Sequence, residues 1–120
     1  GFVNHYYLHR FLAEEGEGFQ ARNYHPRAGG PGSIIMVAGA GVLSSSDNQE
    51  LAQRFLRFLL SPPAQSYFAS ETFEYPLISG IRAQGGQVPI SDFAHPDVPV
   101  TALADLEATQ NLLRITGVLP

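Results

Sequence analysis

The chain has 120 residues, which is the length of one modest domain or of a piece of a larger protein. Hydrophobic residues make up 44% of it and charged residues 15%, a balance that argues against intrinsic disorder. The net charge of −4 argues against nucleic acid or an anionic membrane as the main partner, and the absence of cysteine excludes thiolate metal sites, disulfides and a cysteine nucleophile.

The first predicted element is a helix over about residues 5 to 15. Asn4 is a residue type that caps helix amino ends, and apolar side chains recur behind it at helical spacing until Gly16. Residues 19 to 24 alternate weakly between apolar and polar, which predicts a short strand. Residues 25 to 32 are rich in glycine and proline and are expected to form turns.

A buried strand is predicted over residues 33 to 43. This run, SIIMVAGAGVL, is apolar and contains several β-branched side chains. The stretch that follows, SSSDNQE, contains a capping box formed either by Ser46 with Gln49 or by Asp47 with Glu50. A helix is therefore expected to begin here.

Two helices are predicted on either side of Pro62 and Pro63, because proline ends a helix and is also accepted in the first turn of the next one. Residues 82 to 100 read mainly as loop, and a last helix is expected from Thr101 to Gly117. The alternation of strands and helices predicts an α/β fold. The helix before Pro62 carries one apolar face, made of Leu51, Phe55, Phe58 and Leu59.

Several enzyme and nucleotide-binding motifs are missing. The stretches AGGPG and GAGVL lack the spacing of a phosphate-binding loop, and the sequence has no G-x-S-x-G nucleophile elbow. No apolar run approaches the roughly 20 residues that span a bilayer. Nucleotide binding is therefore not expected, and the sequence shows no Ser/His/Asp set of a hydrolase.

Four stretches carry a resemblance to a known family: NHYYLHR, GPGSIIMVAGAGVLSSSDNQELAQRFLRFLLSPPAQSYFA, ETFEYPLISGI and LADLEATQNLLRITG. Their order and spacing resemble the carboxy-terminal part of bacterial ferric-iron-binding periplasmic proteins, the substrate-binding components of iron(III) ABC importers. The likeness covers nearly the whole chain. The GAGVL strand and the LLSPxAQ pattern are shared with wider solute-receptor families, whereas the adjacent tyrosines point to iron. The chain departs from the family at Ser44, where lysine is common, and at Pro63, where glutamate is common.

The resemblance implies a two-lobed receptor of the type II-like class. It places residues 1–36 in the second lobe, 37–86 in the first lobe and 87–120 back in the second lobe. A whole family member is more than twice this length, so the chain is expected to be a fragment that lacks the signal sequence and a further iron ligand, often His or Glu. The full-length protein is expected to be a monomer, periplasmic or lipid-anchored outside the cytoplasm, that delivers iron to an ABC permease.

The adjacent tyrosines Tyr6 and Tyr7 suit ferric iron on chemical grounds. Fe(3+) is a hard cation that prefers anionic oxygen. A free phenol has a pKa of about 10, but a bound cation stabilises the phenolate strongly. The helix dipole at a first turn adds about 0.3–1 kcal/mol, which is small beside the field of the ion. Tyr6 and Tyr7 are therefore the predicted metal ligands, and ordinary packing on an amphipathic helix is the alternative.

Arg10 follows Tyr6 by four residues and is the candidate for holding a synergistic anion such as carbonate or for steadying a phenolate. A solvated helix residue is the alternative. His5 and His9 flank the tyrosines on one helical face, as metal-binding histidines do, but the family does not clearly place a ligand at either position.

The other histidines and tyrosines are given structural roles. His25 and His95 adjoin prolines and are expected in solvent. Tyr24, Tyr67 and Tyr75 are further candidates for phenolate ligands. Tyr67 is expected in the core instead, and Tyr75 at a packed turn.

Two other functions stay open at this point. A receptor of the same fold for a small organic anion or polyamine would use Tyr6 and Tyr7 as a stacking or hydrogen-bonding wall. An enzyme that uses Tyr and His for proton transfer lacks a recognisable set of acid and base residues.

Overall fold

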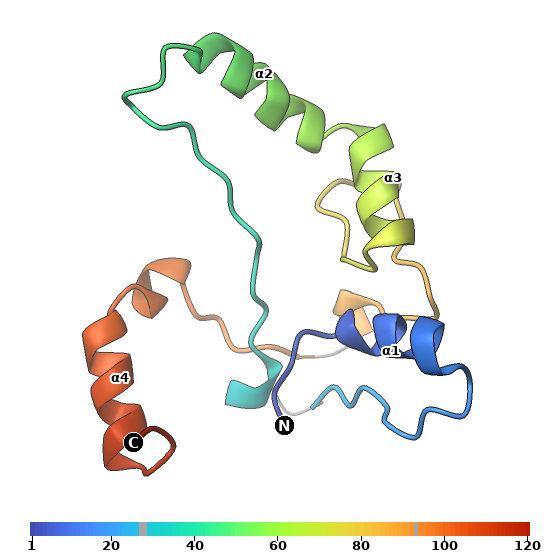
Figure 1. Cartoon of the computed structure of the whole chain (residues 1–120), viewed down its shortest axis with the longest axis vertical. Coiled ribbons are helices and arrows are strands. Elements are labelled where there is room, and N and C mark those ends of the chain that lie inside the picture. Colours follow the sequence, from blue (N-terminus) through green and yellow to red (C-terminus); the bar gives the residue numbers. More distant parts are fainter. Residues whose placement is uncertain (27–28, 93) are drawn as a thin grey trace.

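Helices and long extended segments make up the structure, a computed structural model that describes residues 1–26, 29–92 and 94–120. In chain order the helices are α1 (Tyr7–Glu15), η1 (Pro31–Ser33), α2 (Gln49–Leu59), α3 (Pro62–Glu71), η2 (Ile90–Asp92), η3 (Val100–Leu103) and α4 (Leu106–Ile115), where η marks a 3-10 helix. Helices α2 and α3 follow one another, α1 lies beside the carboxy end of α3, and α4 stands apart (Figure 1). None of the described helices is long and apolar enough to cross a membrane.

The arrangement is open. The radius of gyration is 17.5 Å, against about 14 Å for a compact domain of this length. Among the described residues only Ser33, Ala64, Gln65 and Ala69 are buried. The fold is therefore held by a few local contact regions rather than by one continuous core.

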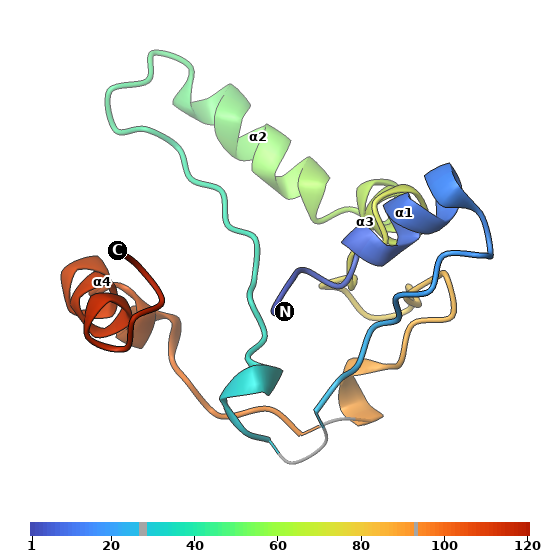
Figure 2. The ribbon, with the colours of Figure 1, turned by 60° about the horizontal axis from the view of Figure 1, so that its bottom comes forward.

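The two predicted strands do not form in the described part of the chain. Residues 19–24 are irregular, and residues 34–43 run as an extended segment that the two views show away from the helices (Figures 1 and 2). The prediction that 33–43 is buried is wrong for most of the segment, since Met36 is 70% and Leu43 76% exposed. A strand needs a neighbour for its backbone N–H and C=O groups, and no neighbouring strand is present within the described residues. The α/β class stays a prediction.

The predicted helix boundaries around the two prolines are confirmed. Helix α2 ends at Leu59, and α3 begins at Pro62 directly after Ser61. Neither form of the predicted capping box is present, because the N-cap residue of α2 is Asn48 and no side chain caps the helix. The Oγ of Ser46 accepts from the backbone N–H of Asn48 at 3.2 Å. The amide of Gln49 instead donates to the carbonyl of Ser44 at 2.8 Å, so these polar groups order the turn before the helix.

Helix α2 does not bury the apolar face that the sequence predicts. Leu51, Phe55 and Phe58 are each more than half exposed, and only Leu59 of that face is half-buried. Tyr67 on α3 is 58% exposed, so its expected place in the core is wrong. The described residues offer no layer that covers this side of the two helices, which is why the amphipathic pattern predicted burial that is not present.

Helix α4 begins later than expected, at Leu106 instead of Thr101, because residues 100–103 form the separate 3-10 helix η3. The carboxylate of Asp105 caps α4 by accepting from the N–H of Ala108 at 2.8 Å. Gly117 follows the helix with φ 74°, the left-handed conformation that glycine allows at a helix end.

Candidate metal centre

The turn that carries the two tyrosines leads directly into α1. The N–H of Tyr7 bonds to the carbonyl of Asn4 at 3.2 Å, and the N–H of His9 bonds to that of Tyr6 at 3.1 Å. Tyr6 is the N-cap residue and Tyr7 the first residue of the helix. Both phenols therefore sit at the amino end of α1, where four backbone N–H groups have no partner within the helix.

The two phenol rings lie side by side. Their centroids are 4.8 Å apart and the ring planes make an angle of 55°. Tyr7 is 39% exposed and Tyr6 is half-buried. The amide of Asn4 donates to the hydroxyl oxygen of Tyr6 at 2.9 Å instead of capping the helix, so the predicted capping role of Asn4 is wrong.

The Nε2 atom of His5 is engaged in a hydrogen bond and is therefore not placed to bind a metal. This nitrogen lies 2.7 Å from the carbonyl oxygen of Phe73, so it carries the proton and donates. The His5 ring packs against Tyr75 with centroids 4.8 Å apart and meets the edge of Tyr6 at 5.6 Å. Burial is the main cause of a lowered pKa of His5, and the backbone bond to Phe73 opposes it.

His9 packs on the same residue as His5. Its ring stacks on Phe73 with centroids 4.2 Å apart and planes only 13° from parallel. Burial also lowers the pKa of His9, with a smaller contribution from the nearby charge of His5. Within the described part of the chain, no group of three or more His, Cys, Asp or Glu side chains is placed to hold a metal. Both histidines instead contact Phe73, His5 at its carbonyl oxygen and His9 at its ring.

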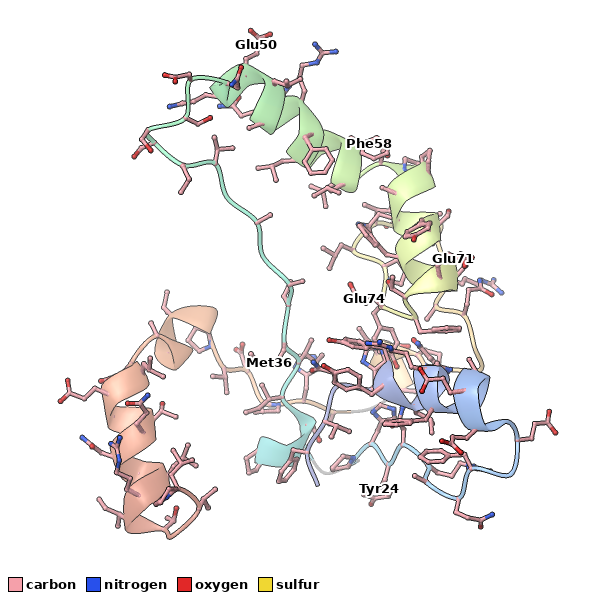
Figure 3. All side chains as sticks on the ribbon, viewed as in Figure 1. Tyr24, Met36, Glu50, Phe58, Glu71 and Glu74 are labelled. Carbon is pink, nitrogen blue, oxygen red and sulfur yellow. The ribbon has the colours of Figure 1, made fainter. Side chains whose placement is uncertain are left out.

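The contact region around the tyrosine turn consists of residues 4–9 on one side and of residues 73–88, after α3, on the other. Figure 3 shows side chains of α1 crowded against this segment, near Glu74. The hydroxyl of Tyr75 donates to the carbonyl of Val88 at 2.6 Å, and burial raises the pKa of this phenol. The amide of Gln87 donates to the carbonyl of Phe73, which His5 also contacts. The expected packing role of Tyr75 is confirmed.

The remaining candidates lie outside this contact region or at its margin. Arg10 is exposed, and the described interactions include none of its own. Tyr24 is 83% exposed on the segment that follows α1 (Figure 3). His25, expected in solvent, is half-buried and close enough to His5 to help lower the pKa of that residue. His95 is exposed, as expected.

Sequence reasoning singled out the adjacent pair Tyr6 and Tyr7 but missed the residues that support this pair. Phe73 lies 68 residues from His5, and Gln87 lies 14 residues beyond Phe73. A local periodic pattern carries no information on such pairs. The one signal was Gly85, since glycine in a loop permits close approach of other groups.

Comparison with known proteins gives the following matches, although no family model matches the chain. The chain is 32% identical over 120 residues to the major ferric iron-binding protein of Neisseria meningitidis serogroup A, covering 96% of this chain and 35% of that protein. It is 30% identical over 105 residues to the Fe(3+)-binding periplasmic protein of Serratia marcescens, covering 86% of this chain and 31% of that protein. It is 36% identical over 84 residues to iron uptake protein A1 of a Synechocystis strain, covering 66% of this chain and 23% of that protein.

The chain is therefore homologous to ferric iron-binding periplasmic proteins over nearly its whole length, and it spans about a third of the length of the relatives from Neisseria and Serratia. The resemblance inferred from the four sequence stretches is confirmed. The relatives are named for binding or uptake of iron and not for catalysis, which agrees with the expectation of a binding protein.

Proposed function

We propose that this homologue of the ferric iron-binding periplasmic proteins forms part of a periplasmic receptor that binds Fe(3+) as its cargo through the phenolate oxygens of Tyr6 and Tyr7. The observation that carries the proposal is the pair of adjacent phenols at the amino end of α1, with ring centroids 4.8 Å apart. In a chain with these relatives, two neighbouring oxygen donors on one rigid turn favour a hard cation over an organic solute.

The chemistry of the pair fits this cargo. Ferric iron prefers anionic oxygen, and its charge offsets the cost of deprotonating a phenol whose ordinary pKa is about 10. The exposed fraction of Tyr7 leaves its side chain accessible to an incoming ion. The hydroxyl oxygen of Tyr6 accepts the Asn4 amide, and such a donor also stabilises an oxygen that has lost its proton.

Helix α1 contributes a smaller favourable term. Both tyrosines lie within one residue of its start, and negative charge at a helix amino end is stabilised by about 0.3–1 kcal/mol. We assign to Arg10, on the same helix, the role of holding a synergistic anion such as carbonate, because its guanidinium is exposed and has no competing partner among the described residues. Further ligands would come from His or Glu residues outside this chain.

The wider biological role follows from the same proposal. The receptor would carry iron in the periplasm as a monomer and deliver it to an ABC permease. Two lobes would close over the ion, with residues 1–36 and 87–120 in one lobe and 37–86 in the other. A signal sequence or lipid anchor would belong to the natural full-length protein.

The test is the colour of the iron-loaded protein. A ferric ion bound by phenolate absorbs visible light by charge transfer from the oxygen. We expect the natural full-length protein to become coloured with Fe(3+) and the double variant Tyr6→Phe/Tyr7→Phe to stay colourless. The variant should lose more than about 100-fold in affinity, because changes outside the ligand set alone cost about 10- to 100-fold.

The double variant Tyr24→Phe/Tyr67→Phe is the matched control, since both of its phenols are more than half exposed and lie outside the turn. It should keep the colour and the affinity. A colourless wild-type protein that binds a small organic anion or polyamine would contradict the iron assignment.

A further inference from the structure

We propose that the main-chain carbonyl of Phe73 anchors the tyrosine turn, and that Gly85 is the residue that allows this anchor to form. Phe73, Gly85 and His5 are positioning residues in this account, because they act on iron through Tyr6 and Tyr7. The inference rests on the proposed function, and it concerns how the two phenols are held in place.

The carbonyl of Phe73 joins segments that are distant in the sequence. It accepts from the Nε2 of His5 at 2.7 Å, across 68 residues, and also from the amide of Gln87. His5 directly precedes Tyr6, and its own carbonyl accepts from the amide of Asn23 at 2.7 Å. The residue before the tyrosine pair is thus fixed through both its side chain and its backbone.

The backbone of Phe73 adopts a conformation that is unfavourable for a residue other than glycine. Its φ is 57°, and it is the one residue other than glycine with positive φ in the described part of the chain. Such a conformation persists where the surroundings enforce it. The residues on either side of Phe73 both donate to the carbonyl of Phe68. The N–H of Glu74 does so at 3.0 Å and the hydroxyl of Thr72 at 2.8 Å.

The same residue holds the turn at a second point. The ring of Phe73 stacks on His9, while its carbonyl bonds to His5. His5 and His9 are four residues apart and flank the two tyrosines. Phe73 therefore contacts the turn on both sides of the phenols, at His5 and at His9. These two contacts restrict rotation of the turn relative to the segment after α3.

Gly85 lies against the stacked rings of His9 and Phe73, and its lack of a side chain leaves space for them. A Cβ atom at Gly85 would lie 2.8 Å from the Cε1 of His9 and 2.9 Å from the Cδ1 of Phe73. Real Cβ contacts are not that short, so the stacked rings would have to move. The next residue, Gly86, has almost the same φ, 70° against 69°, but a Cβ there would meet nothing within 4 Å.

The two glycines therefore form a matched pair for an experiment. Gly85→Ala and Gly86→Ala carry the same cost of placing alanine at positive φ, and only the first displaces the His9–Phe73 stack. We expect Gly85→Ala to lower the Fe(3+) affinity of the natural full-length protein about 10-fold or more and to shift its visible band. Gly86→Ala should change the affinity less than about 3-fold and leave the band in place. Equal effects of the two variants would overturn the proposal.

A second pair of variants tests the hydrogen bond and guards against misfolding of Gly85→Ala. Glutamine at position 5 keeps an N–H donor that can reach the Phe73 carbonyl, whereas leucine has none. His5→Gln should restore most of the affinity and the band position that His5→Leu loses. If both variants lose affinity to the same extent, the bond to Phe73 is not what positions the tyrosines.

A measurement without metal separates this inference from the proposed function. In the metal-free protein, the ring NMR signals of Tyr6 and Tyr7 should move in Gly85→Ala and His5→Leu and stay in place in Gly86→Ala. If that pattern appears but iron gives no colour, the anchor stands and the iron assignment falls. If iron gives colour but the ring signals of Gly85→Ala and Gly86→Ala do not differ, the iron assignment stands and the anchor falls.

Discussion

The turn at Tyr6 and Tyr7 and the helix α2 are held in place by different means. The His5 side chain donates to the backbone carbonyl of Phe73, 68 residues away, and the Asn23 side chain, 18 residues away, donates to the backbone carbonyl of His5. Helix α2 is held by its own backbone bonds and, at its carboxy end, by the amide of Gln65, while its Leu51, Phe55 and Phe58 stay more than half exposed. A strongly amphipathic pattern therefore predicts a helix well but does not ensure a partner for its apolar face.

The difference shows where positional order is concentrated. Hydrogen bonds from a few polar groups to distant partners fix the tyrosine turn, although no residue of α1 is buried. Helices α2 and α4 are less firmly held than the turn, because most of their large apolar side chains face outward instead of packing against other parts of the chain. The proposed metal ligands thus belong to the part of the molecule whose geometry is specified by individual bonds.

The largest stability effect outside the metal centre is expected at Gln65, the buried side chain that links α2 to the segment after α3. Its amide donates to the carbonyl of Leu59 at 2.8 Å, and its oxygen accepts from the N–H of Leu77 at 2.7 Å. Gln65→Met keeps the volume but leaves both backbone groups unpaired, which should cost about 2 kcal/mol of unfolding free energy. Denaturation by urea measures this loss.

Gln53→Met is the control for this change, because Gln53 is an exposed residue of α2. It should change the unfolding free energy by less than about 0.5 kcal/mol. Equal losses in the two variants would show that the link through Gln65 is not what holds α2 against its neighbours.

A smaller and local effect is expected at the start of α4. Asp105→Ala removes the carboxylate that caps the N–H of Ala108, which should cost about 1 kcal/mol. Amide hydrogen exchange should become faster in α4 and stay unchanged in α1, because the two helices have no shared bonds among those described. Asp97→Ala, at an exposed loop residue, should leave both helices unchanged. Faster exchange in α1 would mean that the tyrosine turn depends on α4.

The smallest effect is a pH dependence that comes from Tyr75. Burial raises the pKa of this phenol above its ordinary value of 10.0, so the folded chain holds the proton more tightly than the unfolded chain. The stabilising contribution is complete below pH 10 and is lost as the pH rises through the raised pKa. Unfolding midpoints measured on either side of that pH should fall less in Tyr75→Phe than in wild type. Tyr24→Phe, at a mostly exposed phenol, should retain the wild-type dependence.

The helices could be read from the sequence because their signals are local. The paired prolines set the boundary between α2 and α3, and Gly117 marks the end of α4. The strands at 19–24 and 33–43 could not be judged in this way. A strand exists only with a partner that supplies hydrogen bonds, and β-propensity depends on that context.

The candidate site was predictable in its chemistry but not in its support. Two adjacent phenols and a nearby guanidinium can be recognised from residue types alone. The grip of Phe73 on His5 and His9 could not, because it depends on a contact between distant segments and on an unusual φ. The alternative in which the histidines serve as a ligand pair is disfavoured by the same contacts.

Resonance Raman spectroscopy of the iron-loaded, natural full-length protein tests the central claim most directly. Excitation within the visible band enhances vibrations of only those groups that donate to the metal. We predict enhanced phenolate ring vibrations in wild type, weaker ones in Tyr6→Phe and in Tyr7→Phe, and none in the double variant. Phenolate vibrations that persist in the double variant, or that are missing from the coloured wild type, would contradict ligation by this tyrosine pair.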